Sequence, residues 1–455
     1  MGILGSGIVG EAIQDLIFKH QLRADPELEI IKIFTRNPKV KRWYPAHPEL
    51  FSDRPQDVTD HPEAQIVVEA LGSEEEGQLS HHRDYIVRAF QQGKGVVTSD
   101  KAVLARHGKE IWEAARRFGQ EIRFEACVGG GVPIIRSLTE SFAAEEPEAI
   151  YGIINGTSNY ILSEMEKGGK SYEEALREAQ ERGYAETNPK SDTGGMDAEA
   201  KLILLAAVTF GVHFEPGSIW RQGIEEIHAI DFLYADRKGR GTIKPLAAAW
   251  NEGGAVQSLV SPALVPRGHF LSSIAGPTNG LFFKGKRSGE LPAGRRAELQ
   301  DWNYMFAGPG AGGGPTAVAV LGDVYDLARG GSGHPEGPPS LVDPGVLTAQ
   351  PADKISACFY IRFVVKDRPG IVGDICQTFG NAGINVSEIW QLSHDHDELE
   401  SLTRQHRISQ AAGKILPFVI TLERTSVGQV NQALRIVARQ DYMLIPPIWF
   451  PIWRN

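Results

Sequence analysis

A glycine-rich turn near the start of the chain constrains the fold more than any other feature. The sequence opens MGILGSGIVGEAIQDLIFKH, in which Gly5, Gly7 and Gly10 form G-x-G-x-x-G between an apolar strand and a helical pattern. Glycines at this spacing allow a tight turn and the close approach of a pyrophosphate, whose charge the following helix N-terminus stabilises. The alternative is a turn with a structural role only. The strand–loop–helix context favours a dinucleotide-binding α/β domain, with cofactor contacts from Gly5, Gly7, Ile8, Val9 and Gly10.

Two further strand ends are expected at the same edge of the sheet. Residues 29–37 form a strand pattern that ends near Arg36, which suits the 2′-phosphate of NADP better than the ribose hydroxyls of NAD. A solvated basic loop is the alternative. A later strand carries Ser99 and Lys101 at its carboxyl end, where ligands bind in open α/β sheets. Ser99 is therefore a candidate cofactor contact and Lys101 a candidate at the reacting centre, although a surface lysine fits that position equally well.

Residues 183–201, GYAETNPKSDTGGMDAEAK, join a polar loop to the start of a long apolar helix. Asp197 and Lys201 are four positions apart, so a helix that begins near Gly195 places them on one face. Carboxylates such as Glu186 and Asp197 would hold the ammonium group of a small amino-acid substrate, while Lys201 would exchange a proton with it. The alternative is that Asp197 is a first-turn acid favoured by the helix dipole, with Lys201 as its solvent-exposed partner.

Two more glycine clusters indicate backbone that approaches a ligand. Gly129, Gly130 and Gly131 follow a strand, and the carbonyl groups of such a turn, with Glu125 nearby, would bind a monovalent cation. A tight structural turn is the alternative. The glycine-rich segment 308–314 precedes an apparent helix and is a second place where the main chain would approach a cofactor.

Composition sets the number of domains and excludes several classes of partner. With 455 residues the chain should form two to four domains. A net charge of −10 argues against nucleic acid or an anionic membrane as a main partner. Three cysteines without metal-ligand spacing fit a reducing cytoplasm, and no apolar run reaches the roughly 18 residues of a membrane helix. Residues 330–345 have the composition of a linker, and the two strand–helix units after it predict a small ferredoxin-like domain.

Taken in order, these motifs resemble those of homoserine dehydrogenases over nearly the whole chain. The motifs that carry the resemblance are GSGIVG, TSDKAVLA, EACVGGGVPI, NGTSNYIL, GYAETNPKSDTGGMDAEAK and GPGAGGGPTAVAVLGD. The tail, with DRPGIVGDI as its turn, resembles an ACT domain. The resemblance implies an α/β protein with a Rossmann domain over 1–130 that regains residues 305–329, and an α+β substrate and dimerisation domain over 131–304. A linker over 330–355 and a ferredoxin-like ACT domain over 356–455 would complete it.

The resemblance also implies an activity and its residues: reversible NAD(P)H-dependent reduction of aspartate 4-semialdehyde to homoserine. A sodium ion, threonine as an effector at the ACT domain and a homodimer or homotetramer are further expectations. By position, the implied catalytic residues are Lys201, Lys101 and Asp192, and Glu186 and Asp197 would bind substrate. Gly183 and Gly312 would contact the cofactor, and Glu125, Val128, Gly130 and Val132 would form the sodium site.

Two other functions stay open at this point. A short first strand, only residues 1–4, fits a threonine sensor whose dehydrogenase half is impaired. A dehydrogenase of a related amino-acid semialdehyde is the other, because the acid-rich loop specifies an ammonium group better than it specifies chain length.

Overall fold

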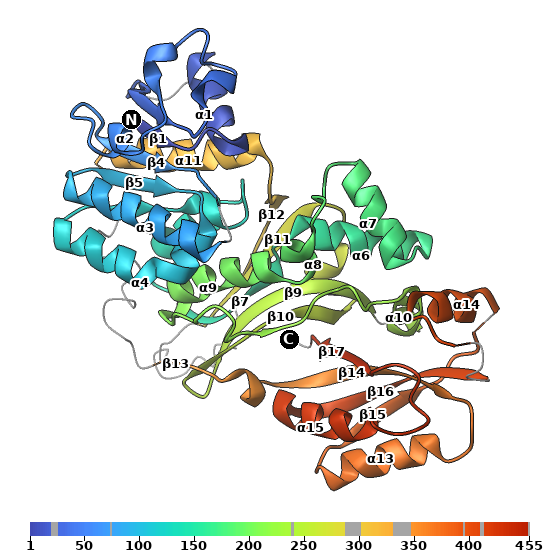
Figure 1. The fold of residues 1–455 in the computed structure, drawn as a ribbon. Helices are drawn as coiled ribbons and strands as arrows, with labels where there is room; N and C mark the ends of the chain where they lie inside the picture. The colour runs from blue at the N-terminus through green and yellow to red at the C-terminus, as the bar shows by residue number, and fades with distance from the viewer. Residues whose placement is uncertain are drawn as a thin grey trace, which may run out of the picture.

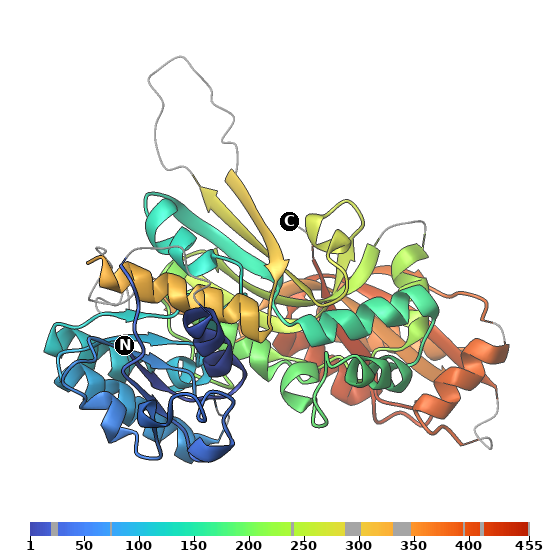
Figure 2. The same cartoon turned by 90° about the horizontal axis from the view of Figure 1, so that it is seen from above.

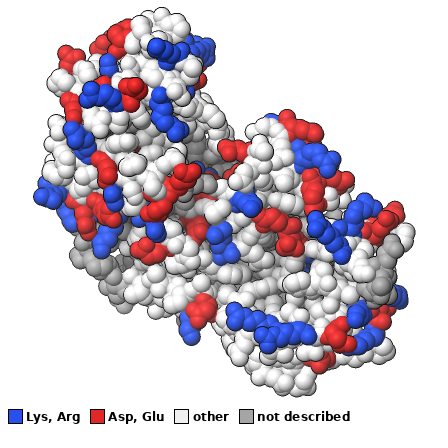
Figure 3. Space-filling view, viewed as in Figure 1, with Lys and Arg blue, Asp and Glu red and all other residues white. Residues whose placement is uncertain are grey.

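The computed structural model describes residues 1–19, 26–72, 75–237, 241–286, 302–330, 347–394, 396–409 and 414–453. Two sheets organise the molecule, one near the N-terminus and one that runs through the rest of the chain (Figure 1). None of the described helices is both long and apolar enough to cross a membrane. On the face seen in Figure 3, acidic and basic side chains are interspersed and do not form a continuous basic surface.

The first sheet is parallel throughout, with strand order β3-β2-β1-β4-β5-β6. Its strands are fully or largely buried, which explains their continuous apolar sequences. Alternate residues face opposite layers: Ile3 and Val68 pack toward α11, whereas Leu4 and Val67 pack toward α3 and α4. The strands are β1 (Gly2–Leu4), β2 (Lys32–Phe34), β3 (Phe51–Ser52), β4 (Ile66–Glu69), β5 (Gly95–Thr98) and β6 (Ile122–Arg123).

Helices cover both faces of this sheet, as the dinucleotide-binding prediction requires. On one face lie α3 (Glu76–Gln91) and α4 (Lys101–Phe118), and on the other lie α1 (Ile8–Phe18) and α11 (Gly313–Ala328). Figure 2 shows α1, in dark blue, beside α11, in yellow-orange, although about 300 residues separate them in sequence. The chain therefore leaves this layer after β6 and returns to it through α11.

The second sheet has eleven strands in the order β12-β11-β7-β9-β10-β17-β14-β16-β15, with β8 and β13 also paired to β10. Its first half carries the helices of the predicted substrate domain, of which α9 (Met196–Phe210) is buried over most of its surface. The other helices here are α5 (Ile134–Arg136), α6 (Gly156–Gly168), α7 (Tyr172–Glu181), α8 (Lys190–Thr193) and α10 (Ala229–Asp236), and α2 (Gln56–Thr59) belongs to the first domain. The strands are β7 (Glu146–Ile153), β8 (Trp220–Arg221), β9 (Gly241–Glu252), β10 (Ala255–Pro266), β11 (Thr278–Lys286), β12 (Trp302–Pro309) and β13 (Thr348–Ala349).

The second half of the sheet is the predicted ferredoxin-like domain. Its strands β14 (Ser356–Lys366), β15 (Val386–Trp390), β16 (Ile415–Ser426) and β17 (Ile448–Ile452) lie in the order 17-14-16-15. The helices α13 (Ile371–Asn381) and α15 (Val427–Val437) cover one face, and α14 (His396–Gln405) lies in the polar insertion. Strand β17 also pairs with β10, where the Trp453 amide donates to the Leu264 carbonyl at 2.8 Å. The two halves therefore form one continuous sheet, which the sequence did not predict.

The structure describes only part of the segment predicted as a linker. Residues 331–346 lie outside the described residues, but residues 348–349 form β13 and pair with β10. Most of the charged segment 284–301 also lies outside the described residues.

Candidate active site

Helix α9 carries the predicted lysine–aspartate pair into the protein interior. Gly195 precedes the helix with φ +80°, and a side chain there would meet Val260 Cγ1 at 3.0 Å, so the sharp entry requires glycine. One turn later, Lys201 Nζ lies 2.6 Å from Asp197 Oδ2 and donates to the Ile154 carbonyl at 2.9 Å. Asp197 is 9% exposed and Lys201 8%. The alternative of a solvent-exposed pair is therefore wrong.

A second lysine reaches the same carboxylate from the first domain. Lys101 is the first residue of α4, directly after β5, and its Nζ lies 3.1 Å from Asp197 Oδ1. Burial alone would raise the pKa of Asp197, but the ammonium groups of Lys201 and Lys101 outweigh it and hold this pKa well below its usual range. The charge of Asp197 in turn raises the pKa of Lys101. A lysine that follows a parallel strand and a lysine of α9 thus both contact the Asp197 carboxylate.

Asn155 completes the cluster and was not predicted as a site residue. It is the N-cap of α6, where its Oδ1 accepts from the Ser158 amide at 2.8 Å. Its Nδ2 donates to Asp192 Oδ1 at 2.7 Å and to Asp197 Oδ2 at 2.9 Å. Burial raises the pKa of the half-buried Asp192. The signal in the sequence was the dense polar turn NGTSN, whose first residue caps α6.

Glu186 lies apart from these groups. It is exposed on the loop between α7 and α8, and its main-chain carbonyl accepts from Gln180 Nε2 at 3.0 Å. Among the described residues its carboxylate makes no hydrogen bond or ion pair with the cluster. The loop itself is held at the N-terminus of α6, because Thr157 Oγ1 donates to the Tyr184 carbonyl at 2.6 Å. Gly183, which begins this loop with φ +73°, is exposed.

The glycine loop has no room for a side chain at two of the three motif glycines, whereas nothing lies within 4 Å of a Cβ built on Gly7. A Cβ on Gly5 would lie 2.4 Å from the Ala70 carbonyl oxygen, and one on Gly10 would lie 2.2 Å from the carbonyl oxygen of Gly5. Ile8, at the start of α1, is 79% exposed and faces outward with open surface around the loop. Gly312, with φ +109°, precedes α11, and the next glycine packs against Ile8.

Basic groups lie beside this loop at the end of β2. Arg36 is exposed just after the strand. Lys41 Nζ donates to the Ser6 carbonyl within the glycine loop and lies 3.4 Å from Glu11 Oε1. Ser99 lies at the end of β5, where its amide donates to the Glu69 carbonyl at 3.0 Å.

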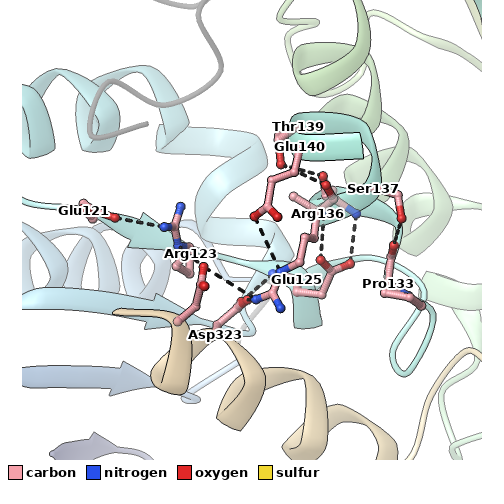
Figure 4. Close-up of polar contacts among 11 residues, drawn as sticks. Glu121, Arg123, Glu125, Pro133, Arg136, Ser137, Thr139, Glu140 and Asp323 are labelled. Carbon is pink, nitrogen blue, oxygen red and sulfur yellow. Dashed lines mark hydrogen bonds and ion pairs between the residues drawn. The ribbon is translucent and has the colours of Figure 1, made fainter. Parts of the chain in front are cut away.

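The carboxylate of Glu125, close to the glycine turn at 129–131, is hydrogen-bonded within the protein. Both carboxylate oxygens of Glu125 accept main-chain amides, from Ile135 at 2.9 Å and Arg136 at 2.8 Å, and burial raises the pKa of this carboxyl group (Figure 4). The Glu125 amide donates to Asp323 Oδ2 at 2.8 Å. The Glu125 side chain is thus committed to the turn that follows. Of the main-chain carbonyls at the predicted ligand residues, that of Glu125 accepts the Val128 amide at 3.3 Å and that of Val132 accepts the Ile134 amide at 2.8 Å.

The chain is similar to one named family along its whole length. Family models described as "Homoserine dehydrogenase", "Homoserine dehydrogenase, NAD binding domain" and "ACT domain" match residues 133–325, 5–125 and 359–439. Homoserine dehydrogenase of Synechocystis sp. is 34% identical over 421 residues, covering 90% of this chain and 93% of that protein. The corresponding protein of Pseudomonas aeruginosa is 31% identical over 446 residues, covering 95% and 94%. The crystal structure of a homoserine dehydrogenase from Thiobacillus denitrificans matches with a TM-score of 0.81 at 29% identity, covering 99% of this chain and 97% of that chain.

Proposed function

The chain belongs to the homoserine dehydrogenase family, and from that premise we propose that the cluster around Asp197 reduces aspartate 4-semialdehyde to homoserine with NADPH, and catalyses the reverse reaction. The observation that carries the proposal is one buried carboxylate that holds a lysine from each of two domains, at 2.6 Å from Lys201 and 3.1 Å from Lys101. The complete cluster does not favour a sensor with an impaired dehydrogenase half.

The protein's part in the reaction is to move a proton and hold the substrate. The bound nicotinamide supplies or accepts a hydride at the carbonyl carbon. A lysine ammonium has three donors, and Lys201 uses one on Asp197 and one on the Ile154 carbonyl. The third remains for the substrate oxygen, to which Lys201 gives a proton during reduction and from which it takes one during oxidation. Lys101, at the cofactor side, stabilises the developing negative charge on that oxygen.

Acidic groups around the lysines define the substrate class. Asp192 is half-buried beside the cluster, and Glu186 lies on the exposed loop that runs along it. Together with Asp197 they place negative charge where an α-ammonium group would bind, which favours an amino-acid semialdehyde over an uncharged aldehyde. Closure of the Glu186 loop on the substrate is required for its carboxylate to take part.

NADP is the proposed form of the cofactor. Arg36 is exposed at the end of β2, where the 2′-phosphate of the adenosine ribose would lie, and Lys41 adds a second positive charge at the glycine loop. Arg36→Ala should lower kcat/KM for NADP at least tenfold while changing kcat/KM for NAD less than threefold. Equal losses with both cofactors would contradict the assignment.

We propose three further features, which the family resemblance implies. The carbonyl oxygens of the 125–132 turn are the right type of ligand for sodium. The ACT domain provides a place for threonine as an effector. A homodimer or homotetramer is proposed for the assembly. The rate of homoserine oxidation with and without sodium salts tests the cation site, and the rate with and without threonine tests the effector. The mass of the protein in solution tests the assembly.

Lysine variants test the catalytic assignment directly. Lys201→Ala should lower kcat at least a hundredfold with NADPH binding preserved, and Lys201→Arg should fail as well because arginine keeps its proton. Lys109→Ala, at an exposed position of α4, is the matched control and should keep normal turnover. Turnover of the Lys201→Ala variant within threefold of wild type would refute the role.

A further inference from the structure

A buried polar cluster that the proposed reaction does not use lies behind Lys101. Glu69 ends β4, Asp100 follows β5 and His82 comes from α3, and the three are 0%, 4% and 6% exposed. His82 Nδ1 lies 2.9 Å from Asp100 Oδ2 and 3.9 Å from Glu69 Oε1. Three polar side chains in an otherwise apolar layer are costly unless they serve a specific arrangement.

The cluster is joined to Lys101 through the start of α4. Asp100 is the N-cap of that helix, and its Oδ1 accepts the amides of Ala102 at 3.0 Å and Val103 at 3.3 Å. Lys101 is the next residue and extends to Asp197. The orientation of the Asp100 carboxylate therefore sets the direction in which α4 begins, and among the described residues its Oδ2 is hydrogen-bonded by His82.

Hydrogen bonding rather than metal ligation explains the cluster. One ligand atom each from Glu69, His82 and Asp100 lie within 4.8 Å of one another. Both oxygens of Glu69 are nevertheless occupied, by the Leu71 amide at 2.9 Å and by Thr98 Oγ1 at 2.5 Å. Both oxygens of Asp100 are occupied too, by the helix amides and His82.

The surroundings of the cluster also raise the pKa values of two of its members. Burial and the charge of Asp100 raise the pKa of Glu69 to about 7. Burial lowers the pKa of His82, but the hydrogen bond to Asp100 and the charge of Glu69 outweigh it, so the net shift is upward. Two other ionisable groups lie near the cluster, Lys101 and Cys127. Burial raises the pKa of the Cys127 thiol, and the thiol therefore stays neutral.

Charged groups on the outer side of α3 and α4 are paired with one another. Glu76 lies 3.0 Å from Arg106 Nε and 3.8 Å from His107 Nε2, and Glu110 lies 3.0 Å from Arg83 Nη1 and 3.9 Å from His107 Nδ1.

We propose that His82 is a positioning residue for the reaction. By holding Asp100 Oδ2 it fixes the cap of α4 and so places Lys101 against Asp197 and the substrate oxygen. The proposal rests on the proposed function, in which Lys101 acts on the carbonyl. A displacement of about 1 Å at a reacting group can cost about a hundredfold in rate, so a residue two contacts away has a measurable effect.

Paired histidine variants test the proposal. His82→Ala should lower kcat tenfold or more with KM for NADP changed less than twofold. His82→Asn, whose amide nitrogen can take the place of Nδ1, should restore at least half of that loss on a logarithmic scale. His81→Ala, at the exposed neighbouring position, should match wild type. The pH profile of kcat between pH 6 and 8 should change in both His82→Ala and His82→Asn, which lack the imidazole, and should match wild type in His81→Ala.

Two outcomes would overturn the proposal. One is an unchanged kcat and pH profile in His82→Ala. The other is equal loss in His82→Ala and His82→Asn, which would point to packing alone. Should His82→Ala fail to fold, the comparison of His82→Asn with His82→Gln, which moves the amide by one methylene, keeps the test decisive: only the Asn variant should retain turnover.

A readout independent of turnover separates this inference from the proposed function. The rate of reductive methylation of Lys101, followed by mass spectrometry, should rise at least threefold in His82→Ala and stay unchanged in His81→Ala. Absence of homoserine oxidation by wild-type protein would refute the proposed function. An unchanged Lys101 labelling rate in His82→Ala would refute the positioning role.

Discussion

Asp192 and Asp197 lie in one cluster and share the Asn155 amide, yet the structure predicts that only the loss of the Asp197 charge destabilises the protein strongly. Asp197 is held ionised by two lysines, whereas burial raises the pKa of Asp192. Asp197→Asn removes the counter-charge of the buried Lys201 while keeping the side-chain shape. Asp192→Asn removes a charge that burial disfavours.

The magnitude follows from the burial of each pair. Removing one partner of a buried ion pair costs about 3–5 kcal/mol. The Lys101 side chain is 37% exposed, so its pair with Asp197 adds at most about 1 kcal/mol. The amide oxygen of the variant still accepts a hydrogen bond from Lys201, so the lower end applies and the expected loss for Asp197→Asn is about 3 kcal/mol. For Asp192→Asn we expect a change within about 0.5 kcal/mol.

Urea unfolding of the ligand-free variants, followed by circular dichroism, measures both changes. Because the folded-state pKa of Asp197 is depressed, its contribution is complete above its ordinary pKa of about 3.9 and is lost as the pH falls through the folded-state value. The deficit of Asp197→Asn should therefore be constant from pH 8 to about 5 and shrink below about pH 4. A deficit below about 1 kcal/mol at pH 7, or an equal deficit in Asp192→Asn, would refute the electrostatic reasoning.

Two other substitutions test the fold around the site. Gly10→Ala places a Cβ 2.2 Å from a main-chain oxygen of the glycine loop, and it should lower NADPH affinity at least tenfold by fluorescence titration. The control is Gly322→Ala, in the middle of α11, where a Cβ meets open space. Gly322→Ala should leave NADPH affinity unchanged and add up to about 1 kcal/mol of stability. Arg362 of β14 and Asp231 of α10 form a fully buried ion pair 3.1 Å apart, and Arg362→Met should cost about 3–5 kcal/mol in urea unfolding. Adding Asp231→Leu removes the unpaired carboxylate and should recover part of that loss. No recovery would contradict an uncompensated charge as the cause.

Local patterns predicted the parts of the site that neighbouring residues determine. The G-x-G-x-x-G spacing predicted the first turn, because no side chain fits at Gly5 or Gly10. The four-residue spacing of Asp197 and Lys201 predicted their shared helix face. The alternation of two strand–helix units predicted the ferredoxin-like domain, whose strand order follows from the connections available to such units.

Contacts between distant segments were out of reach of the same reasoning. The sequence pattern predicted Lys101 at the end of a strand but did not predict its contact with Asp197, because that contact depends on how two domains pack. Asn155 opens the NGTSNYIL motif, yet its bonds to two aspartates depend on the approach of the loop after α7. The pairing of β17 with β10 is a single short register between domains and carries no pattern of its own. Glu186, predicted from the polar segment 183–201 and from the resemblance, lies on an exposed loop apart from the Asp197 cluster.

The two lysines on Asp197 differ in a way that suits a reaction cycle. The pair with Lys201 is buried on both sides, so breaking it leaves a desolvated charge and is costly. The pair with Lys101 is partly exposed, so it is worth about 1 kcal/mol or less and breaks readily when a substrate oxygen competes for the ammonium group. Lys201 is therefore expected to keep its place through the cycle, while Lys101 exchanges Asp197 for substrate. Lys101 moves more easily than Lys201, so its orientation depends most on Asp100, the N-cap residue directly before it. His82 influences this orientation through its hydrogen bond to Asp100.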